Sequence, residues 1–388
     1  MDSPRSEDPP THSVLVQGWV AIEPGSVWEG AFIDTGELRP LDLIPRPDVE
    51  AHFAGWQVAG YQAALPITPE SAGRRWSVVF RIDGNEYRDL LPFEPSASAL
   101  DEFRAIKRKK LERVEPLLRC PRPVPGGAGV DCHGELRAVD EATLECTRCG
   151  TRYGRTAEQF DMLPSELALK TGIEHTDNIS AWGYDPYATD IIQSHADGLV
   201  LDAGSGFKQT LYEHVVDAEI VAYPSTDVLS VGEHLPFADG AFDAALSLNV
   251  LEHVRDPFRC AQELARVVRP GGKLYTSVPF LQPYHGFPHH YYNMTESGLR
   301  NLFGDTFEVD TLAVPAPALP IWTLSWFLNS YVAGLPTDVA ARFQDLKVGD
   351  LMGPGESYLH EDFVAQLRAS TNTELACGFI LLGTRRDD

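Results

Sequence analysis

The sequence predicts an α/β protein built on a parallel, doubly wound sheet, with an all-β sandwich and a small four-cysteine ribbon ahead of it. Three observations support this prediction. Over 198–280, apolar runs alternate with segments of helical periodicity, and the first run, "GLVLDAGSG", ends in a glycine turn. Residues 13–96 alternate apolar and polar side chains in short runs between Gly, Pro, Asp and Asn turns. Four of the six cysteines lie between 120 and 149.

Length, composition and charge indicate a globular chain of several domains. Its 388 residues are 43% hydrophobic, and Lys+Arg 32 against Asp+Glu 56 gives a formal net charge of −24. Nucleic-acid binders need a basic surface, so this charge argues against RNA or DNA as the substrate. The polar start predicts a disordered tail at 1–12 and no signal peptide, and prolines interrupt the apolar stretch 316–335, so no transmembrane segment is expected. Clustered cysteines without a secretory signal favour a reducing compartment, and we expect a cytoplasmic protein.

The segment 13–96 is predicted to be a β-sandwich. Its "GW" strand, "RPDV" and the following Phe and "AGY" resemble accessory β-sandwich domains of bacterial glycan-assembly enzymes. That resemblance implies a role in polysaccharide biosynthesis and contacts with glycan-assembly enzymes. The segment also holds four tryptophans, for which core packing is favoured over stacking on sugars: Trp19, Trp28, Trp56 and Trp76.

A helix over 97–118 is predicted to join the sandwich to the ribbon. It carries a basic stripe, because six of the twelve residues at 103–114 are Lys or Arg. A solvated linker helix is the favoured interpretation, and a binding stripe is the alternative.

The segment 119–163 is predicted to be a zinc ribbon. "CTRCG" at 146–150 has the C-x-x-C spacing with which two thiolates of one turn reach the same metal. "CP" at 120 and "CHGEL" at 132 match the two ends of the usual partner strand, as if a loop had been inserted between them. The predicted ligands of a structural Zn²⁺ are Cys120, Cys132, Cys146 and Cys149. His133 is a substitute ligand if Cys120 does not take part, and Cys260 and Cys377 are expected in apolar cores.

The turn at 202–206 is the first candidate for function. Gly204 and Gly206 allow the backbone to approach a ligand closely, but a third glycine is missing from the dinucleotide-binding pattern. Asp202 would repel a phosphate and suits a ligand that carries positive charge. A helix is expected to follow this turn.

Four motifs in order, D-x-G-x-G, LPF-x-D-x-x-FD, N-V-LEHV-x-DP and R-x-x-RPGG-x-L, resemble class I S-adenosylmethionine (SAM)-dependent methyltransferases over 198–312. The resemblance implies a Rossmann-like sheet and SAM as the cofactor. The cofactor-binding residues that it implies are Asp202, Ala203, Gly204, Ser205, Gly206, Glu219, Leu235, Asn249 and Leu251. Glu219 would accept hydrogen bonds from the ribose hydroxyls, with Asp217 as the alternative. The usual adenine-binding aspartate is missing, because Val231 and Gly232 stand in its place and Asp227 lies further upstream.

The methyltransferase domain is predicted to cover 164–388. It would include a helical cap at 164–197 and an apolar insertion at 313–373. The loop that follows the fifth strand carries three histidines close together, and their pattern resembles methyltransferases of bacterial polysaccharide and secondary-metabolite pathways. The candidates for a catalytic base are His285, His289 and His290, because an unperturbed imidazole exchanges protons near neutral pH.

The predicted function is SAM-dependent O-methylation of a sugar, a glycan intermediate or a related hydroxylated metabolite. An RNA methyltransferase is the first alternative, because a four-cysteine ribbon also precedes some rRNA-modifying domains, although the net charge opposes it. A non-catalytic scaffold that binds glycans or proteins through a degenerate methyltransferase domain is the second.

Overall fold

The computed structural model describes residues 12–44, 46, 49, 53, 55–124, 131–171, 180–181, 183–286 and 289–376, without the side chains at 166, 170 and 171. The predicted tail at 1–11 and the predicted core residue Cys377 therefore lie outside the described residues. His12, which the sequence placed in the tail, is buried. Its ring stacks on Phe103 at 4.4 Å, and Nε2 donates a hydrogen bond of 2.9 Å to the carbonyl of Lys208.

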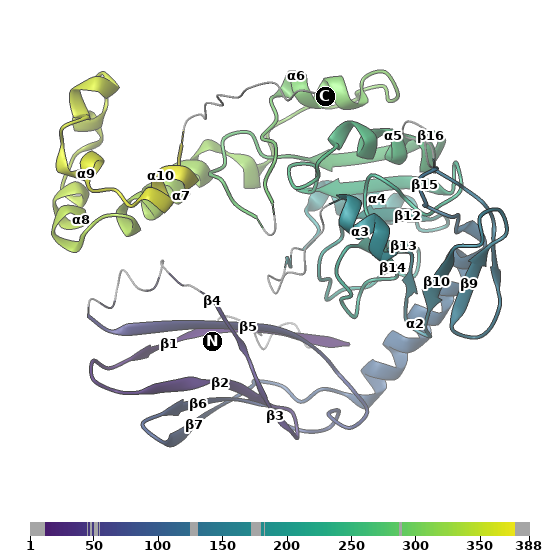
Figure 1. Cartoon of the computed structure of the whole chain (residues 1–388), viewed down its shortest axis with the longest axis horizontal. Coiled ribbons are helices and arrows are strands. Elements are labelled where there is room, and N and C mark those ends of the chain that lie inside the picture. Colours follow the sequence, from purple (N-terminus) through teal and green to yellow (C-terminus); the bar gives the residue numbers. More distant parts are fainter. Residues whose placement is uncertain are drawn as a thin grey trace, which may run out of the picture.

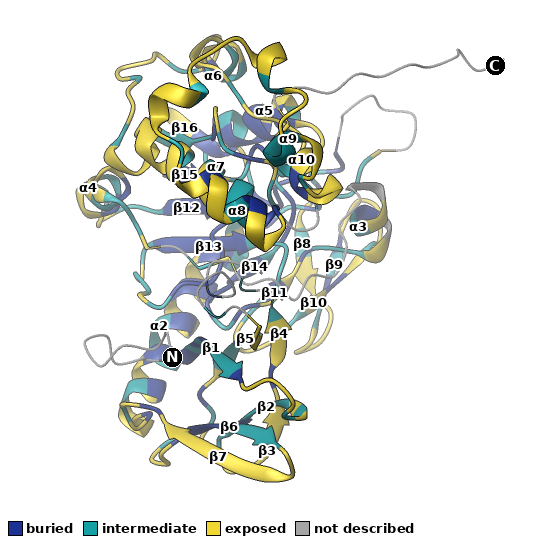
Figure 2. Ribbon diagram, turned by 90° about the vertical axis from the view of Figure 1, so that its left-hand side faces the viewer, coloured by how far each residue is buried: buried dark blue, intermediate teal, exposed yellow. Residues whose placement is uncertain are grey.

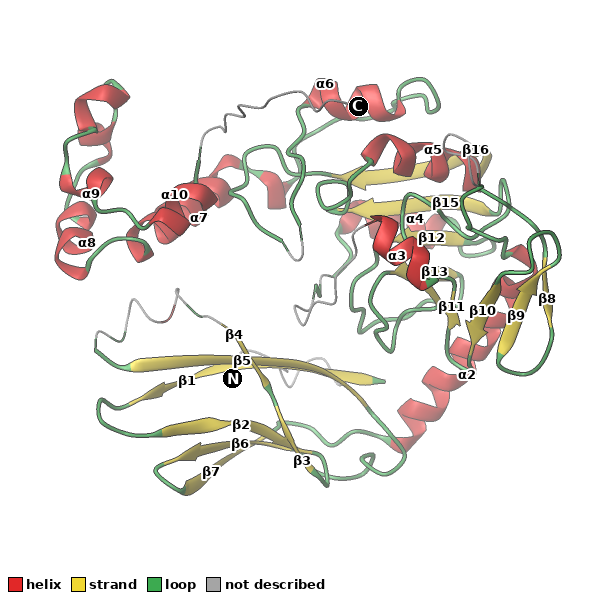
Figure 3. Cartoon of the chain, in the orientation of Figure 1, coloured by secondary structure: helices red, strands yellow, loops and turns green. Residues whose placement is uncertain are grey.

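The N-terminal part consists of two antiparallel sheets that share one apolar core (Figure 3). The strands of the first sheet, in spatial order, are β1 (Ser13–Ile22), β5 (Gln57–Pro66) and β4 (Asp42–Ile44). Those of the second are β3 (Leu38–Pro40), β2 (Trp28–Asp34), β6 (Ser77–Ile82) and β7 (Asn85–Leu90). Trp76 is a core residue, with 0% exposure and an indole that donates to the carbonyl of Ser71, whereas Trp56 is 40% exposed.

The middle part of the chain forms a nine-stranded sheet, which lies on the right in Figure 1. Six of its strands are parallel, and the first five in spatial order are β16 (Val268–Ser277), β15 (Phe242–Leu248), β12 (Val200–Ala203), β13 (Val215–Glu219) and β14 (Val228–Leu229). The strand order reverses between β12 and β15, which is where ligands bind in open α/β sheets.

Helices cover both faces of these parallel strands. Successive side chains of a strand point to opposite faces. Leu201 packs in one apolar cluster with Ala261 and Leu264 of α5 (Pro257–Val267), whereas Val200 packs in another with Ile192 of α4 (Pro186–Ser194). The parallel strands thus have helices on both faces, as expected for a doubly wound sheet.

The helix expected after the glycine turn is absent, because residues 204–214 form turns and bends. Backbone donors of this segment bond to other parts of the chain: Phe207 N–H to the carbonyl of Ser180, and Lys208 N–H to Ser225 Oγ. The upstream helix α2 (Ala97–Val114) packs against β13 instead.

Two lysines of the basic stripe on α2 fit neither of its interpretations. Lys107 and Lys110 are 0% and 1% exposed, so they are neither solvated nor available to a partner. Lys110 Nζ lies 2.6 Å from Asp217 and 2.7 Å from Asp227, and Lys107 Nζ lies 2.7 Å from Asp227. The helix is anchored to the parallel sheet by buried ion pairs.

The cysteine-rich segment extends the same sheet. Its strands are β8 (Leu136–Ala138), β9 (Thr143–Cys146), β10 (Arg152–Arg155) and β11 (Phe160–Asp161). β11 pairs in parallel with β14, with Phe160 opposite Val228, so this segment and the parallel strands are joined by backbone hydrogen bonds.

The predicted cap and insertion contain several helices. The cap contains α3 (Ser165–Thr171) and α4, and the region after α6 (Glu296–Phe303) contains α7 (Pro320–Ala333), α8 (Thr337–Gln344), α9 (Asp362–Ala365) and α10 (Ala369–Glu374). Figure 2 shows much of α7 exposed, and Trp322 is 62% exposed. None of the helices in the described ranges combines the length and apolar character that a bilayer-spanning segment requires.

Candidate active site

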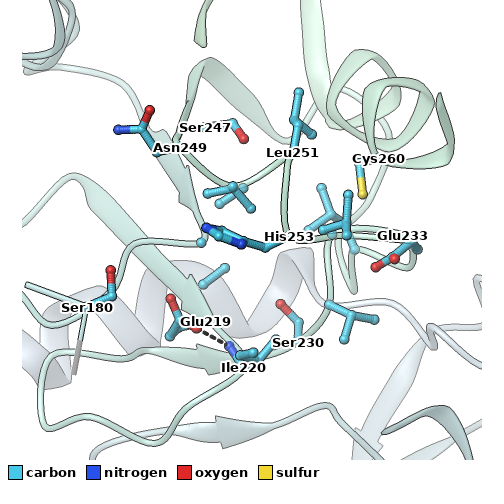
Figure 4. A pocket seen from close by; sticks show the side chains of 18 of the residues that line it. Ser180, Glu219, Ile220, Ser230, Glu233, Ser247, Asn249, Leu251, His253 and Cys260 are labelled. Carbon is cyan, nitrogen blue, oxygen red and sulfur yellow. Dashed lines mark hydrogen bonds between the residues drawn. The ribbon is translucent and has the colours of Figure 1, made fainter. Parts of the chain in front are cut away.

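A cavity opens at the carboxyl ends of the parallel strands, beside the point where strand order reverses. Six predicted cofactor-binding residues line it: Ala203, Gly204, Glu219, Leu235, Asn249 and Leu251. Figure 4 shows Glu219 and Ser230 on one side of His253, and Asn249 and Ser247 on the other. The strand ends therefore bring together residues that are far apart in the sequence.

The glycine turn shapes the wall of this cavity. Gly204 has φ +79°, and a Cβ at this position would lie 2.5 Å from Val250. Gly206 has φ +64°, and its N–H donates a hydrogen bond of 2.7 Å to Glu219 Oε2. Both positions require glycine, because other residues rarely adopt positive φ and a side chain would meet its neighbours.

Glu219 stands at the end of β13, as predicted. Its Oε1 accepts a second hydrogen bond of 2.7 Å from the N–H of Ile220 (Figure 4). Burial raises the pKa of this carboxyl. Each carboxylate oxygen has a further lone pair, so Glu219 can still accept hydrogen bonds from two hydroxyls in the cavity.

Three predicted cofactor residues, Asp202, Ser205 and Gly206, do not line the cavity. Asp202 is 1% exposed, accepts a hydrogen bond of 2.8 Å from Tyr184 and lies 3.5 Å from Lys208 Nζ. A lysine of the protein thus lies beside the carboxylate that was expected to face a positively charged ligand.

The alternatives for ribose and adenine are also decided by buried contacts. Asp217 is paired with Lys110, and Asp227 with both Lys107 and Lys110, so neither carboxylate faces the cavity. Gly232 and Glu233 do line it. Only backbone groups were expected from this segment, so the side chain of Glu233 was not predicted; burial raises the pKa of its carboxyl.

Asn249 occupies a conformation that few residues adopt. Its φ is +54°, and its N–H donates a hydrogen bond of 2.9 Å to the carbonyl of Ser277 on β16. Asn tolerates this left-handed region better than most residues. The unusual backbone ends β15 beside the cavity.

The three histidine candidates occupy different positions. His289 lines the cavity, and its ring lies 5.2 Å from that of Tyr291. His290 does not line it, and both of its ring nitrogens are engaged: Nδ1 accepts from the N–H of His285, and Nε2 lies 2.9 Å from Asn293 Oδ1. His285 does not line it either, and its ring lies 5.3 Å from that of His253 and 5.3 Å from that of Trp326 on α7.

"LEHV" was noted as a motif, and Glu252 was expected beside the methionine portion of the cofactor, but His253 was missed as a site residue. His253 lines the cavity, and Glu252 is buried behind it. Burial raises the pKa of Glu252 to about 8 and lowers the pKa of His253. Only the folded chain shows that these two residues meet the loop of His285.

The four cysteines come together at the other end of the sheet. The Sγ atoms of Cys120 and Cys149 are 3.5 Å apart, those of Cys132 and Cys146 are 3.7 Å apart, and all four lie within 4.8 Å of one another. Tetrahedral zinc–thiolate bonds place sulfur atoms about 3.8 Å apart, so the cluster fits zinc. His133, the substitute ligand, lies with Asp131 and Glu263 instead.

The region of the parallel strands is similar to known proteins. Residues 199–276 match the family model described as "Methyltransferase domain". The chain contains a methyltransferase domain. An uncharacterized methyltransferase of Mycobacterium sp. (strain KMS) is 42% identical over 84 residues, which are 21% of this chain and 30% of that protein. Another, from Mycobacterium sp. (strain JLS), is 58% identical over 45 residues, 12% of this chain and 18% of that protein.

The chain thus spans less than a third of the length of these two relatives. A solved structure described as a SAM-dependent methyltransferase and possible histamine N-methyltransferase, from Thermotoga maritima, is 19% identical. It covers 30% of this chain and 69% of its own, with a TM-score of 0.23.

Proposed function

We propose that this protein is a SAM-dependent O-methyltransferase that acts on a small hydroxylated acceptor, such as a sugar, a glycan intermediate or a related metabolite. One observation carries the proposal: the glycine turn, Glu219 and Asn249 surround a single cavity that His253 and His289 also line. A cofactor-sized site and proton-accepting side chains therefore share one space.

Different residues of the cavity would contact different parts of the cofactor. Glu219 would hold the ribose hydroxyls, and the segment from Gly232 to Leu235 would contact the adenine. Gly204 and Asn249 would flank the methionine portion. SAM supplies an electrophilic methyl group, and the protein has to hold the acceptor oxygen in line with it, which contributes much of the rate.

His289 is the proposed general base. It lines the cavity, whereas the pyrrole-type and pyridine-type nitrogens of His290 both have partners. A base within reach of the acceptor hydroxyl would remove its proton as the methyl group is transferred.

Two observations oppose the alternatives. Lys107 and Lys110 of the basic stripe form buried ion pairs, so less basic surface is available to RNA. A degenerate domain would have no need for two glycines at positive φ beside an open cavity, and both are present. We also propose that the four cysteines hold a structural zinc ion, and that the N-terminal sheets contact glycan or glycan-assembly enzymes.

The experiment has two stages. Titration calorimetry with SAM and with its demethylated product should show binding of both to the folded chain. Methyl-labelled SAM and fractionated lysate should then place the label in a small-molecule or glycan fraction. Label in RNA or protein, or no cofactor binding, would overturn the proposal.

Once the acceptor is known, His289→Ala should lower turnover by roughly two to four orders of magnitude and leave SAM affinity nearly unchanged. His195→Ala is the matched control, because His195 lies at the opposite end of the strands, where Nδ1 bonds the carbonyl of Ile191. Equal turnover in the two variants would exclude His289 as the base.

A further inference from the structure

Glu252 is buried without the partners that a buried carboxyl group requires. Its exposure is 0%, and neither carboxylate oxygen has a hydrogen-bond partner among the described residues. Buried carboxyl groups are normally hydrogen-bonded, paired with an opposite charge or bound to a metal ion. The side chain is therefore expected to have a partner that the chain itself does not supply.

Two histidines beside Glu252 are held in one tautomer. His253 Nδ1 lies 2.8 Å from the carbonyl of His289, and His285 Nδ1 lies 2.8 Å from the carbonyl of Pro283. A carbonyl oxygen only accepts hydrogen bonds, so each Nδ1 carries the proton and each Nε2 keeps a lone pair. Metal-bound histidines are usually oriented in this way.

The three side chains converge. His253 Nε2 lies 3.8 Å from Glu252 Oε1, and one ligand atom from each of Glu252, His253 and His285 lies within 4.8 Å of the others. Metal–ligand bonds of about 2.1 Å place ligand atoms roughly 3–4 Å apart, so small side-chain rotations would close the site. Gly286 allows the loop to come this close, since a Cβ there would lie 2.6 Å from His253 Cε1.

We propose that Glu252, His253 and His285 bind a divalent transition-metal ion, of which zinc is the best match. Two imidazoles and one carboxylate are the donors of catalytic zinc sites that keep a fourth position open. Magnesium and calcium prefer oxygen ligands and are poor matches for this set. His253 lines the cavity, so an ion bound to its imidazole would lie at the wall of the proposed site.

A second group with metal-binding side chains lacks these properties. Asp131 and Glu263 lie near His133, but Asp131 is paired with His234 and Arg259, and Glu263 with Arg259 and Arg266. Their carboxylates already have partners, and this group carries no proposal.

The role of the metal rests on the proposed function. An acceptor hydroxyl bound at the open position would lose its proton more easily, because the ion stabilises the alkoxide. The proton passes to His289, the acceptor oxygen forms a bond to the methyl carbon, and the carbon–sulfur bond breaks with its electron pair left on sulfur. The alkoxide and the sulfonium become a neutral ether and a neutral thioether.

The test counts metals and identifies their ligands. The full chain, freed of metal and reloaded with Co²⁺, should bind two ions: one with a thiolate-to-cobalt charge-transfer band from the cysteines, and one without it. Glu252→Gln and His285→Asn should each lose the second ion and keep the charge-transfer band, and the control His195→Ala should keep both.

Failure of the metal site can be distinguished from failure of the proposed function. A wild-type chain that binds only the thiolate-ligated ion, or variants that retain the second ion, would overturn the metal site. His285→Asn keeps the test valid if Glu252→Gln does not fold, because His285 lies on a loop. SAM binding by calorimetry in the same samples reports on the proposed function independently of the second ion.

Discussion

At the scale of single residues, the cavity depends on positions where only one kind of side chain is tolerated. Gly204 combines φ +79° with a Cβ position 2.5 Å from Val250. Gly271 has nearly the same φ, +77°, but nothing lies within 4 Å of its Cβ position. A side chain would strain the backbone at both glycines, but it would meet a neighbouring residue only at Gly204.

We expect Gly204→Ala to weaken SAM binding by tenfold or more, about 1.4 kcal/mol, because the new methyl group pushes Val250 or the turn into the cavity. Gly271→Ala carries the same backbone cost without the contact and should bind SAM like the wild type. Calorimetry on both folded variants measures the difference. Similar affinities in the two variants would show that the turn does not contact the cofactor.

His12 makes stability depend on pH. Burial, the largest cause, lowers the pKa of its imidazole from 6.5 to about 4. Between these values the unfolded chain binds a proton that the folded chain does not, so the free energy of unfolding falls as the pH drops from 6.5 to 4. The shift corresponds to roughly 3 kcal/mol.

His12→Gln should remove this part of the pH dependence. Urea unfolding of the wild type and the variant at several pH values between about 7 and 4 measures this pH dependence of the free energy of unfolding. Parallel curves for the two proteins would mean that His12 does not titrate with the low pKa.

At the scale of elements, α2 replaces the expected crossover helix and is held by charges that are removed from water. Lys110 contacts Asp217 and Asp227, with side-chain exposures of 0%, 2% and 0%. On the same helix, Lys109 pairs with Glu213 at the surface, with side-chain exposures of 61% and 49%. Burial rather than charge makes the difference between these lysines.

Lys110→Met should lower the free energy of unfolding by about 3–5 kcal/mol, because it leaves a buried carboxylate without its partner. Lys109→Met should change it by less than about 1 kcal/mol. Denaturant unfolding of both variants provides the measurement. Equal effects would contradict the assignment of α2 as an anchored part of the sheet.

At the scale of the whole molecule, the cysteine cluster and the cofactor cavity are connected. β11 pairs with β14, and Asp131 beside Cys132 bonds His234 Nδ1 at 2.8 Å and Arg259 at 3.0 Å. Arg259 in turn donates to the carbonyl of Glu233, which lines the cavity. The sequence predicts the ribbon as a separate domain, but these contacts join it to the cavity through Glu233.

Cys146→Ser should therefore abolish zinc binding and also weaken SAM binding by roughly tenfold, since loss of a structural metal site loosens the strands and loops that it holds. Elemental analysis and calorimetry measure the two effects. Glu141→Ala, on an exposed turn of the same ribbon, is the control and should change neither. Unchanged SAM affinity in the zinc-free variant would show that the ribbon folds independently of the cavity.

Much of the architecture follows from local patterns. Alternating apolar side chains determined the N-terminal strands, and apolar runs that end in Gly204 or at Glu219 determined the parallel strands, because periodicity and glycine turns act over a few residues. The C-x-x-C at Cys146 and Cys149 identified the cysteine cluster for the same reason. The methyltransferase motifs identified six of the residues that line the cavity.

Tertiary structure alone decided which groups share a buried space. The sequence placed Lys107 and Lys110 on a linker, but their carboxylate partners lie on or next to strands more than a hundred residues later. Glu252 and His253 became a candidate metal site only when the loop of His285 folded onto them. Pairings between distant segments depend on how helices and sheets pack, and spacing along the chain carries no signal for them.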